Sequence, residues 1–104
     1  MLGDIGKMMK QVNEMKSKMK DVEKELKNLI LKGSSQDNTV EVEMSGKMEL
    51  KSIKIDPQLI TSNDVKKIEK NTFDAVQKSL KMAKDTAADK LGKVTGGAKL
   101  PGIS

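Results

Sequence analysis

The chain has 104 residues but no cysteine, histidine or arginine, and its only aromatic residue is Phe73. Without cysteine there can be no disulfide framework, thiolate metal site or cysteine nucleophile. Without histidine the commonest general base and the usual nitrogen ligand of zinc are missing. No apolar run approaches the roughly 18 residues of a membrane-spanning helix, and the N-terminus lacks the basic-then-apolar layout of a secretory signal. We therefore expect a soluble cytoplasmic protein without a metal or cofactor.

The polar residues form no pattern that predicts an enzyme. Ser34-Ser35 lacks both a histidine base and the frame of a nucleophile elbow. Glu41 and Glu43 share one face of a predicted strand, but their alternation with apolar residues places them in solvent rather than in a cleft. The glycines near the C-terminus precede no helix that would hold a phosphate. We therefore expect neither catalysis nor a small-molecule substrate.

The formal net charge is +5, and all twenty cations are lysines. Lysine is a point charge on a flexible stem and suits phosphates, whereas arginine is the usual bidentate reader of guanine edges. If the chain binds nucleic acid, phosphate contacts should dominate and sequence preference should be weak. Any preference would come mainly from the shape or deformability of the duplex.

An apolar seam runs through the first third of the chain in an unbroken 3-4-3-4 rhythm. Written as heptads, every a and d position of this stretch is apolar, as in a coiled coil. The seam consists of Ile5, Met8, Val12, Met15, Met19, Val22, Leu26 and Leu29. A helix over about residues 4–30 would be roughly 40 Å long, whereas a compact chain of this length has a radius of gyration of about 13 Å. The helix should overhang the rest of the chain, so we expect its seam to pack against a second subunit in a homodimer.

The end of this first helix allows two interpretations. Gly33 suits the C′ position, and Lys32 suits the negative end of the helix dipole, which together predict a helix end near Lys32-Gly33. Alternatively, a short strand begins at Leu29 and runs toward Ser34. The sheet has two strands in the first case and three in the second.

The following segment predicts a β-hairpin. Residues 39–44 alternate apolar and acidic side chains, as in a half-buried strand. A tight turn follows in which Gly46 can take positive φ. A second strand covers about residues 48–55, and its inward set shifts phase from Met48 and Leu50 to Ile53 and Ile55. This shift predicts a β-bulge near Lys51-Ser52.

A second long helix follows the strands. Asp56 is expected to cap a short helical step at Pro57, and Thr61 or Ser62 to cap the long helix, which should stop at Gly92. Its expected apolar stripe is Val65, Ile68, Thr72 or Phe73, Val76, Leu80, Ala83, Ala87 and Leu91. The fold class is α+β, with two long helices on a small antiparallel sheet of two or three strands. We expect one domain over residues 1–94 and a flexible Gly/Pro-containing tail over residues 95–104.

The lysines are concentrated in the two predicted helices, and the predicted strands are acidic. Such segregated basic stretches are what a surface that follows a phosphate backbone needs. The candidate DNA-binding residues are Lys7, Lys10, Lys16, Lys18 and Lys20 in the first helix, followed by Lys66, Lys67 and Lys70 in the second. The alternative is that these lysines only solvate exposed helix faces and form pairs such as Glu14–Lys18 within a helix.

Three segments resemble the bacterial YbaB/EbfC nucleoid-associated proteins. They are the Met-rich opening over residues 1–19, the segment Ile53-Lys54-Ile55-Asp56-Pro57-Gln58-Leu59-Ile60, and the Gly-rich ending Thr95-Gly96-Gly97-Ala98-Lys99-Leu100-Pro101-Gly102. The resemblance covers nearly the whole chain. It implies a tweezer-like homodimer that binds double-stranded DNA in the cytoplasm, alters the conformation of the DNA and helps to organise the nucleoid. This sequence departs from the family in lacking arginine, which argues against base-specific recognition more than against DNA binding.

Two other functions remain open from the residues alone. A seam that dimerisation does not consume would leave an adaptable Met-rich groove, as in a protein-binding adaptor or holdase. Binding to an anionic membrane surface is disfavoured because the helices lack aromatic anchors. We therefore expect the partners to be a second copy of the chain and double-stranded DNA, with no membrane partner.

Overall fold

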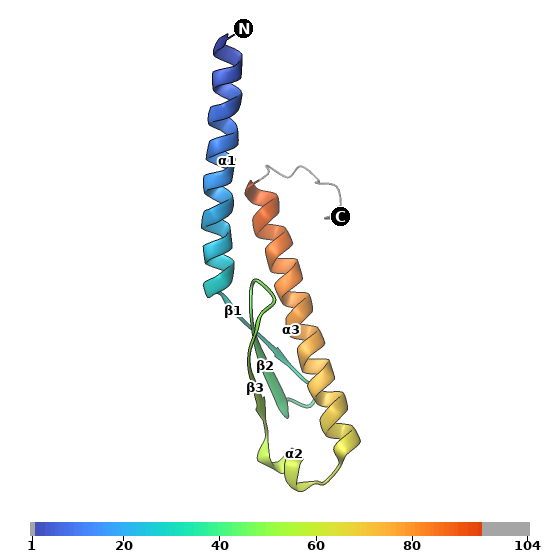
Figure 1. Cartoon of the computed structure of the whole chain (residues 1–104). Coiled ribbons are helices and arrows are strands. Elements are labelled where there is room, and N and C mark those ends of the chain that lie inside the picture. The colour runs from blue at the N-terminus through green and yellow to red at the C-terminus, as the bar shows by residue number, and fades with distance from the viewer. Residues whose placement is uncertain (1, 95–104) are drawn as a thin grey trace.

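The computed structural model describes the backbone of residues 2–94 and the side chains of residues 4–94. It contains α1 (Leu2–Asn28), β1 (Ile30–Ser34), β2 (Val40–Ser45), β3 (Leu50–Ile55), α2 (Pro57–Thr61) and α3 (Val65–Val94). The molecule is elongated, with extents of 72 × 23 × 14 Å, and the first half of α1 projects beyond everything else (Figure 1). The predicted α+β class is confirmed, with three strands. The expected tail over residues 95–104 lies outside the described residues.

The sheet is antiparallel in the order β1-β2-β3. Glu43 pairs with Ser52 and Met44 with Leu50, so Lys51 has no partner on β2. The predicted β-bulge is therefore confirmed at Lys51. The β2–β3 turn differs from the prediction, because the residue with positive φ is Met48 (65°). Gly46 is small for another reason, since a Cβ there would meet the carbonyl oxygen of Leu26 at 2.8 Å.

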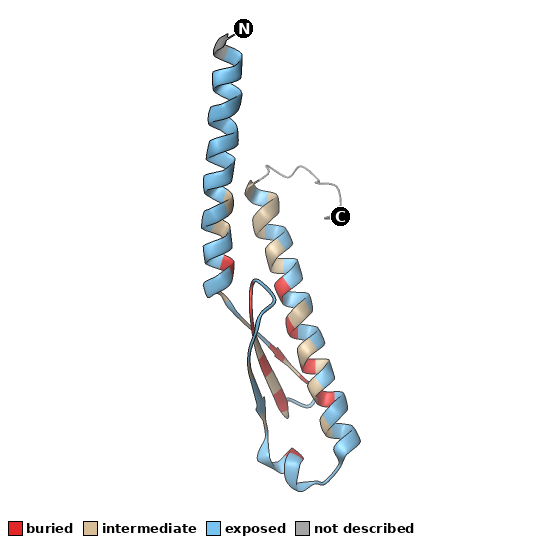
Figure 2. Ribbon diagram, viewed as in Figure 1, coloured by how far each residue is buried: buried red, intermediate tan, exposed pale blue. Residues whose placement is uncertain are grey.

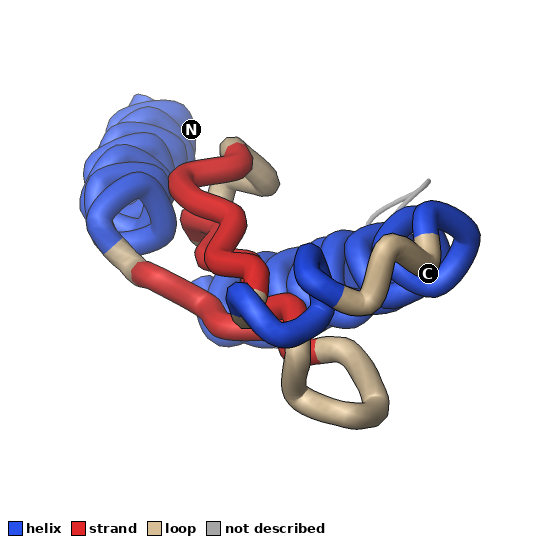
Figure 3. The backbone as a smooth tube through the Cα atoms, turned by 90° about the horizontal axis from the view of Figure 1, so that it is seen from below, coloured by secondary structure: helices blue, strands red, loops and turns tan. Residues whose placement is uncertain are grey.

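The core lies between α3 and the first two strands of the sheet. Val40 and Val42 are fully buried beneath Ala75 and Leu59. α3 contacts β1 and β2, and Figure 3 shows the strands lying between the end of α1 and α3. The inner face of β3 is consequently left open, apart from Ile55, which packs against the core.

The most buried face of α3 overlaps the predicted stripe only in part. Ala83 is buried as expected, and Ile68 and Val76 are half-buried and pack against the core. The buried residues of α3 are Asn71, Ala75, Ser79 and Ala83. Val65 is 63% exposed, against the prediction, and of the alternatives Thr72 and Phe73 it is Thr72 that is half-buried while Phe73 is 63% exposed. The reason is the close approach of β1, where a Cβ on Gly33 would lie 2.5 Å from the backbone nitrogen of Ser79. Only small residues fit at such a distance, so size rather than hydrophobicity decides which face packs.

α1 ends at Asn28 and gives way to β1, so the helix end predicted near Lys32-Gly33 is wrong and the strand alternative is right. Gly33 is not a helix cap but the one buried residue of β1. The lower end of α1 packs on the body of the molecule, with Leu26 only 5% exposed. Figure 2 shows the contrast between this end and the fully exposed upper half.

The caps around α2 and α3 were predicted in part. Asp56 caps α2 as expected, its carboxylate accepting a hydrogen bond from the Gln58 amide at 2.9 Å. The cap of α3 is Asp64, which accepts from the Lys67 amide at 3.1 Å. Thr61 and Ser62, the predicted caps, instead donate their hydroxyls to carbonyl groups of α2. α3 also continues past Gly92 to Val94. Within the described residues no helix is both long and apolar enough to cross a membrane.

Candidate nucleic-acid interface

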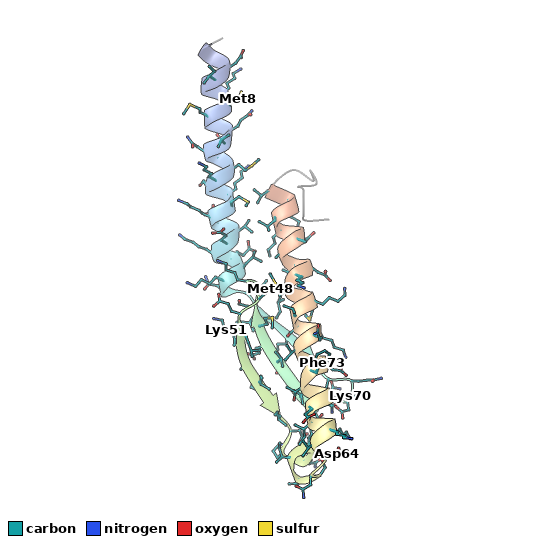
Figure 4. All side chains as sticks on the ribbon, turned by 45° about the vertical axis from the view of Figure 1, so that its right-hand side comes forward. Met8, Met48, Lys51, Asp64, Lys70 and Phe73 are labelled. Carbon is teal, nitrogen blue, oxygen red and sulfur yellow. The ribbon has the colours of Figure 1, made fainter. Side chains whose placement is uncertain are left out.

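The N-terminal two-thirds of α1 carries the first group of candidate lysines. Every residue from Asp4 to Lys18 is exposed, as is Lys20. The five lysines of this group are Lys7, Lys10, Lys16, Lys18 and Lys20. Figure 4 marks the region by Met8, near the free end of the helix. Lys7 and Lys10 stand clear of the rest of the described chain, whereas Lys18 lines a shallow groove together with Lys90 and Lys93 near the end of α3.

Few acids neutralise these cations. Within residues 4–94 none of the five lysines forms an ion pair, whereas lysines elsewhere do. The acids of α1 gather nearer the sheet at Asp21, Glu23 and Glu25, where Glu25 pairs with Lys90 of α3. The net positive charge of α1 therefore lies in residues 4–20, which hold five lysines and two acids, and it is concentrated over Lys16, Lys18 and Lys20.

The second group of candidates lies at the start of α3. Lys66, Lys67 and Lys70 are all exposed, and Figure 4 marks Lys70. The Lys67 ammonium lies 3.9 Å from a carboxylate oxygen of Asp37. One of the three predicted lysines is thus partly neutralised by a residue that is 30 positions away in the sequence.

Two further lysines extend this group along α3. Lys81 and Lys84 are exposed, and eighteen residues, or five helical turns, separate Lys84 from Lys66. Lys66, Lys70, Lys81 and Lys84 therefore share the face opposite the buried Ala75. The helical spacing of these four lysines in the sequence could have predicted that they share one face. Lys81 also contacts Asp85 at 3.1 Å.

Asp37 holds the β1–β2 loop against α3. Its carboxylate accepts hydrogen bonds from the hydroxyls of Thr39 at 2.7 Å and Ser35 at 2.9 Å. The amide of Asn71, a buried residue of α3, donates to the same carboxylate at 3.0 Å. These donors, the Thr39 hydroxyl foremost, keep the pKa of Asp37 well below its ordinary value despite partial burial. Asp37 therefore stays ionised and fixes the end of α3 that carries Lys66 and Lys70.

The two lysine groups lie toward opposite ends of the molecule (Figure 1). Its length of 72 Å equals the span of roughly 40 phosphates of a duplex lying lengthwise, at one charge per ~1.7 Å of axis. A single chain thus offers two separated cationic surfaces rather than one groove. Such surfaces suit contacts to a phosphate backbone, and base edges would need the finer geometry that arginine supplies.

Comparison with known proteins identifies the family of this chain. A model of the YbaB/EbfC DNA-binding family matches residues 1–98. The chain belongs to the YbaB/EbfC DNA-binding family. A nucleoid-associated protein of Pelotomaculum thermopropionicum is 34% identical over 101 residues, covering 97% of this chain and 96% of that protein. One of Rhodopseudomonas palustris strain BisA53 is 36% identical over 100 residues, covering 96% and 95% respectively.

A solved structure confirms the fold of this YbaB/EbfC chain. The crystal structure of HP0035 from Helicobacter pylori superposes with a TM-score of 0.77, covering 86% of this chain and 94% of that one. Sequence identity between the two is 20%, so the likeness concerns the arrangement of helices and strands. The resemblance drawn from the three sequence segments is thus confirmed over nearly the full length.

Proposed function

We propose that this YbaB/EbfC chain is a homodimer that binds double-stranded DNA through phosphate contacts, with little sequence specificity. By bending or clamping the duplex it would alter DNA conformation and contribute to nucleoid organisation and gene regulation in the cytoplasm. The single observation that carries the proposal is the set of five exposed lysines on residues 7–20 of α1, none of which forms an ion pair within the described residues. Lys66, Lys67 and Lys70 of α3 form the second set of proposed contacts.

An uncovered apolar surface supports the homodimer. Ile53 pairs with Val42 and Leu50 with Met44, so both point to the core side of the sheet. Yet Ile53 is 42% and Leu50 51% exposed, because α3 does not extend over β3. Apolar patches of this kind mark protein interfaces.

The neighbouring flank of α3 continues this surface. Val76 of α3 and Ile55 of β3 both pack against the same core cluster. Phe73 and Leu80, three and four residues from Val76, lie on the same side of the helix. We call Leu50, Ile53, Phe73, Val76 and Leu80 the β3–α3 surface. A second copy seated on it would bury Phe73, the only aromatic residue of the chain, and double the number of cationic helices.

DNA binding is tested by a mobility-shift titration on two unrelated duplexes at several salt concentrations. Each phosphate contact contributes about −0.9 to the slope of log K against log salt. Replacing Lys7, Lys10 and Lys16 by Gln should therefore make the slope shallower by ~2.7 if each lysine neutralises one phosphate. Both duplexes should lose affinity equally, because these contacts read no bases.

A matched control separates a local contact from a change of net charge. Replacing Lys47, Lys51 and Lys54 by Gln lowers the net charge by the same three units on the hairpin and β3. This variant should keep most of the wild-type slope. Equal losses in the two triple variants would contradict the assignment to α1, and tight binding that ignored salt would contradict phosphate recognition altogether.

A further inference from the structure

The upper part of the α1 seam has no partner in the described chain. Ile5, Met8, Val12 and Met15 are 57%, 64%, 51% and 47% exposed, and Met9 beside them is 63% exposed. Met19 and Val22, lower on the same seam, are already half-buried where α3 approaches. The exposed part forms a shallow apolar groove lined by Met8, Gln11, Val12, Met15, Lys16 and Met19. We call residues 5–15 of α1 the upper seam.

We propose that the upper seam pairs antiparallel with the upper seam of a second copy, as a self-association contact distinct from the β3–α3 surface. Antiparallel overlap puts Ile5 opposite Met15 of the second copy and Met8 opposite Val12 of the second copy. The two-fold axis repeats both contacts, which makes four layers in which every a residue meets a d residue. The contact is isologous and self-complementary, as two-fold symmetry requires.

The residues flanking the seam favour this arrangement. In antiparallel coiled coils each g position faces the g position of the other helix. In this register Asp4 then lies beside Lys18 of the second copy, and the symmetry axis repeats this opposite-charge pair. Met9, at an e position, meets Met9 of the second copy near the axis. The pairing thus covers an apolar residue that the seam alone leaves exposed.

A parallel pairing is disfavoured by the shape of the chain. It would continue downward into Met19, Val22 and Leu26, a face that α3 and the sheet already occupy. It would also bring both sheets and both α3 helices to the same end. The antiparallel pairing uses residues 4–18, which lie above the contact of Met19 and Val22 with α3; the upper part of this stretch projects from the body (Figure 1). It would place the two bodies at opposite ends.

The consequence is a link between DNA-binding units. Lys7 and Lys10 occupy c and f positions, which face away from the paired helix, so they stay accessible. Three turns of helix make a weak contact alone. When two copies bind the same duplex, the effective concentration of one upper seam near the other rises. The weak contact then forms more readily without any new interaction. The pairing itself requires no DNA, so it can hold or fail independently of the proposed function.

Cysteine cross-linking tests the register directly, because the natural chain contains no cysteine. Single variants Ile5→Cys, Lys10→Cys, Gln11→Cys and Met15→Cys are treated with a short bismaleimide, with and without a duplex. We expect Gln11→Cys to cross-link to itself, and Ile5→Cys to cross-link to Met15→Cys in a mixture. Each yield should be several times that of Lys10→Cys, whose position faces outward. Yields no higher than that of Lys10→Cys would overturn the proposal.

Orientation and seam chemistry are tested by two further comparisons. Strong self-cross-linking of Ile5→Cys, with none between Ile5→Cys and Met15→Cys, would indicate parallel helices and overturn the antiparallel register. In the Gln11→Cys background, Val12→Glu should abolish cross-linking, whereas Asn13→Glu, with the same charge change outside the seam, should preserve it. Equal yields in these two variants would show that the seam is not the contact. Circular dichroism confirms that each variant stays helical.

Discussion

The close approach of β1 to α3 makes a strong prediction for Gly33→Ala. A Cβ at this position would lie 2.5 Å from the Ser79 nitrogen, 2.7 Å from the Ala75 carbonyl oxygen and 2.9 Å from the Ser79 Cβ. Two of these atoms belong to the backbone of a long helix, so no flexible side chain can move aside. The strand or the helix must shift as a whole, and the buried layer above Val42, the β2 partner of Gly33, opens with it.

The size of the effect follows from overpacking. Forcing an extra carbon into a well-packed core costs typically 1–3 kcal/mol, and the backbone contacts of Gly33 place this substitution near the upper end, at about 3 kcal/mol. Small domains have total stabilities of roughly 5–15 kcal/mol, so the loss is a large share. For a domain of this size about 1 kcal/mol shifts Tm by ~4–8 °C. We therefore expect Gly33→Ala to lower Tm by roughly 12–24 °C.

The assay is thermal and urea unfolding followed by circular dichroism, at equal chain concentration because an oligomer's stability depends on it. Gly6→Ala is the matched control, since a Cβ at Gly6 has nothing within 4 Å. The same chemical change should raise helix content there and stabilise by at most about 1 kcal/mol. A Gly33→Ala protein within ~0.5 kcal/mol of wild type, inside the range of ordinary surface substitutions, would refute the close packing described here.

Two further predictions concern the loop and the dimer. Asp37→Asn should destabilise the chain at pH 7, because hydrogen bonds from Thr39 above all, and from Asn71, lower the folded-state pKa of Asp37. The stabilisation by the Asp37 carboxylate is complete above the ordinary carboxyl pKa of ~3.9, and it is lost as the pH falls toward the lowered folded-state pKa. The difference in unfolding free energy between wild type and Asp37→Asn should therefore shrink in acid. A difference that stayed constant from pH 7 to 2 would contradict this prediction. Ile53→Glu should convert the proposed dimer to single chains in light scattering, whereas Lys51→Gln, with the same charge change on β3, should not; an unchanged mass for Ile53→Glu would exclude the β3–α3 surface.

The sheet could be read from the sequence because its signals are local. Alternation over residues 39–44 defines β2, and the phase change in the next strand locates the bulge at Lys51. Asp56 before Pro57 gave the cap of α2 for the same reason. Each of these features depends on residues a few positions apart, so no knowledge of the tertiary structure was needed.

The packing of α3 could be predicted from the sequence only in part. Hydrophobicity favours Val65 and Phe73 for the buried face, yet the helix buries Ala75 and Ser79. The choice depends on Gly33, more than forty residues earlier, which lets the backbones approach. Gly33 itself was interpreted as a helix cap, since a glycine after a helical pattern usually is one. Its actual role exists only once β1 and α3 are together.

The candidate interface likewise has one feature that the sequence predicted and one that depends on tertiary contacts. The sequence predicted that Lys7 to Lys20 lie on a helix that projects from the body. This was possible because the seam gives the expected length of the helix, and that length exceeds the size of a compact chain. It could not predict that Lys67 faces Asp37, since that contact joins the β1–β2 loop to α3. Which of the lysines touch DNA stays a prediction until the triple variants are measured.

The division of α1 into two halves is the feature that links folding to function. The lower half, from Met19 to Leu26, packs on the body and helps to hold α1 in place. The upper half adds almost no tertiary contact, and an isolated helix of that length is marginal in water. It persists because it continues a helix that is already nucleated below, yet it exposes four apolar seam residues to solvent. Folding of this chain alone does not require that apolar face or its surrounding lysines, so their use must lie in contacts with other molecules.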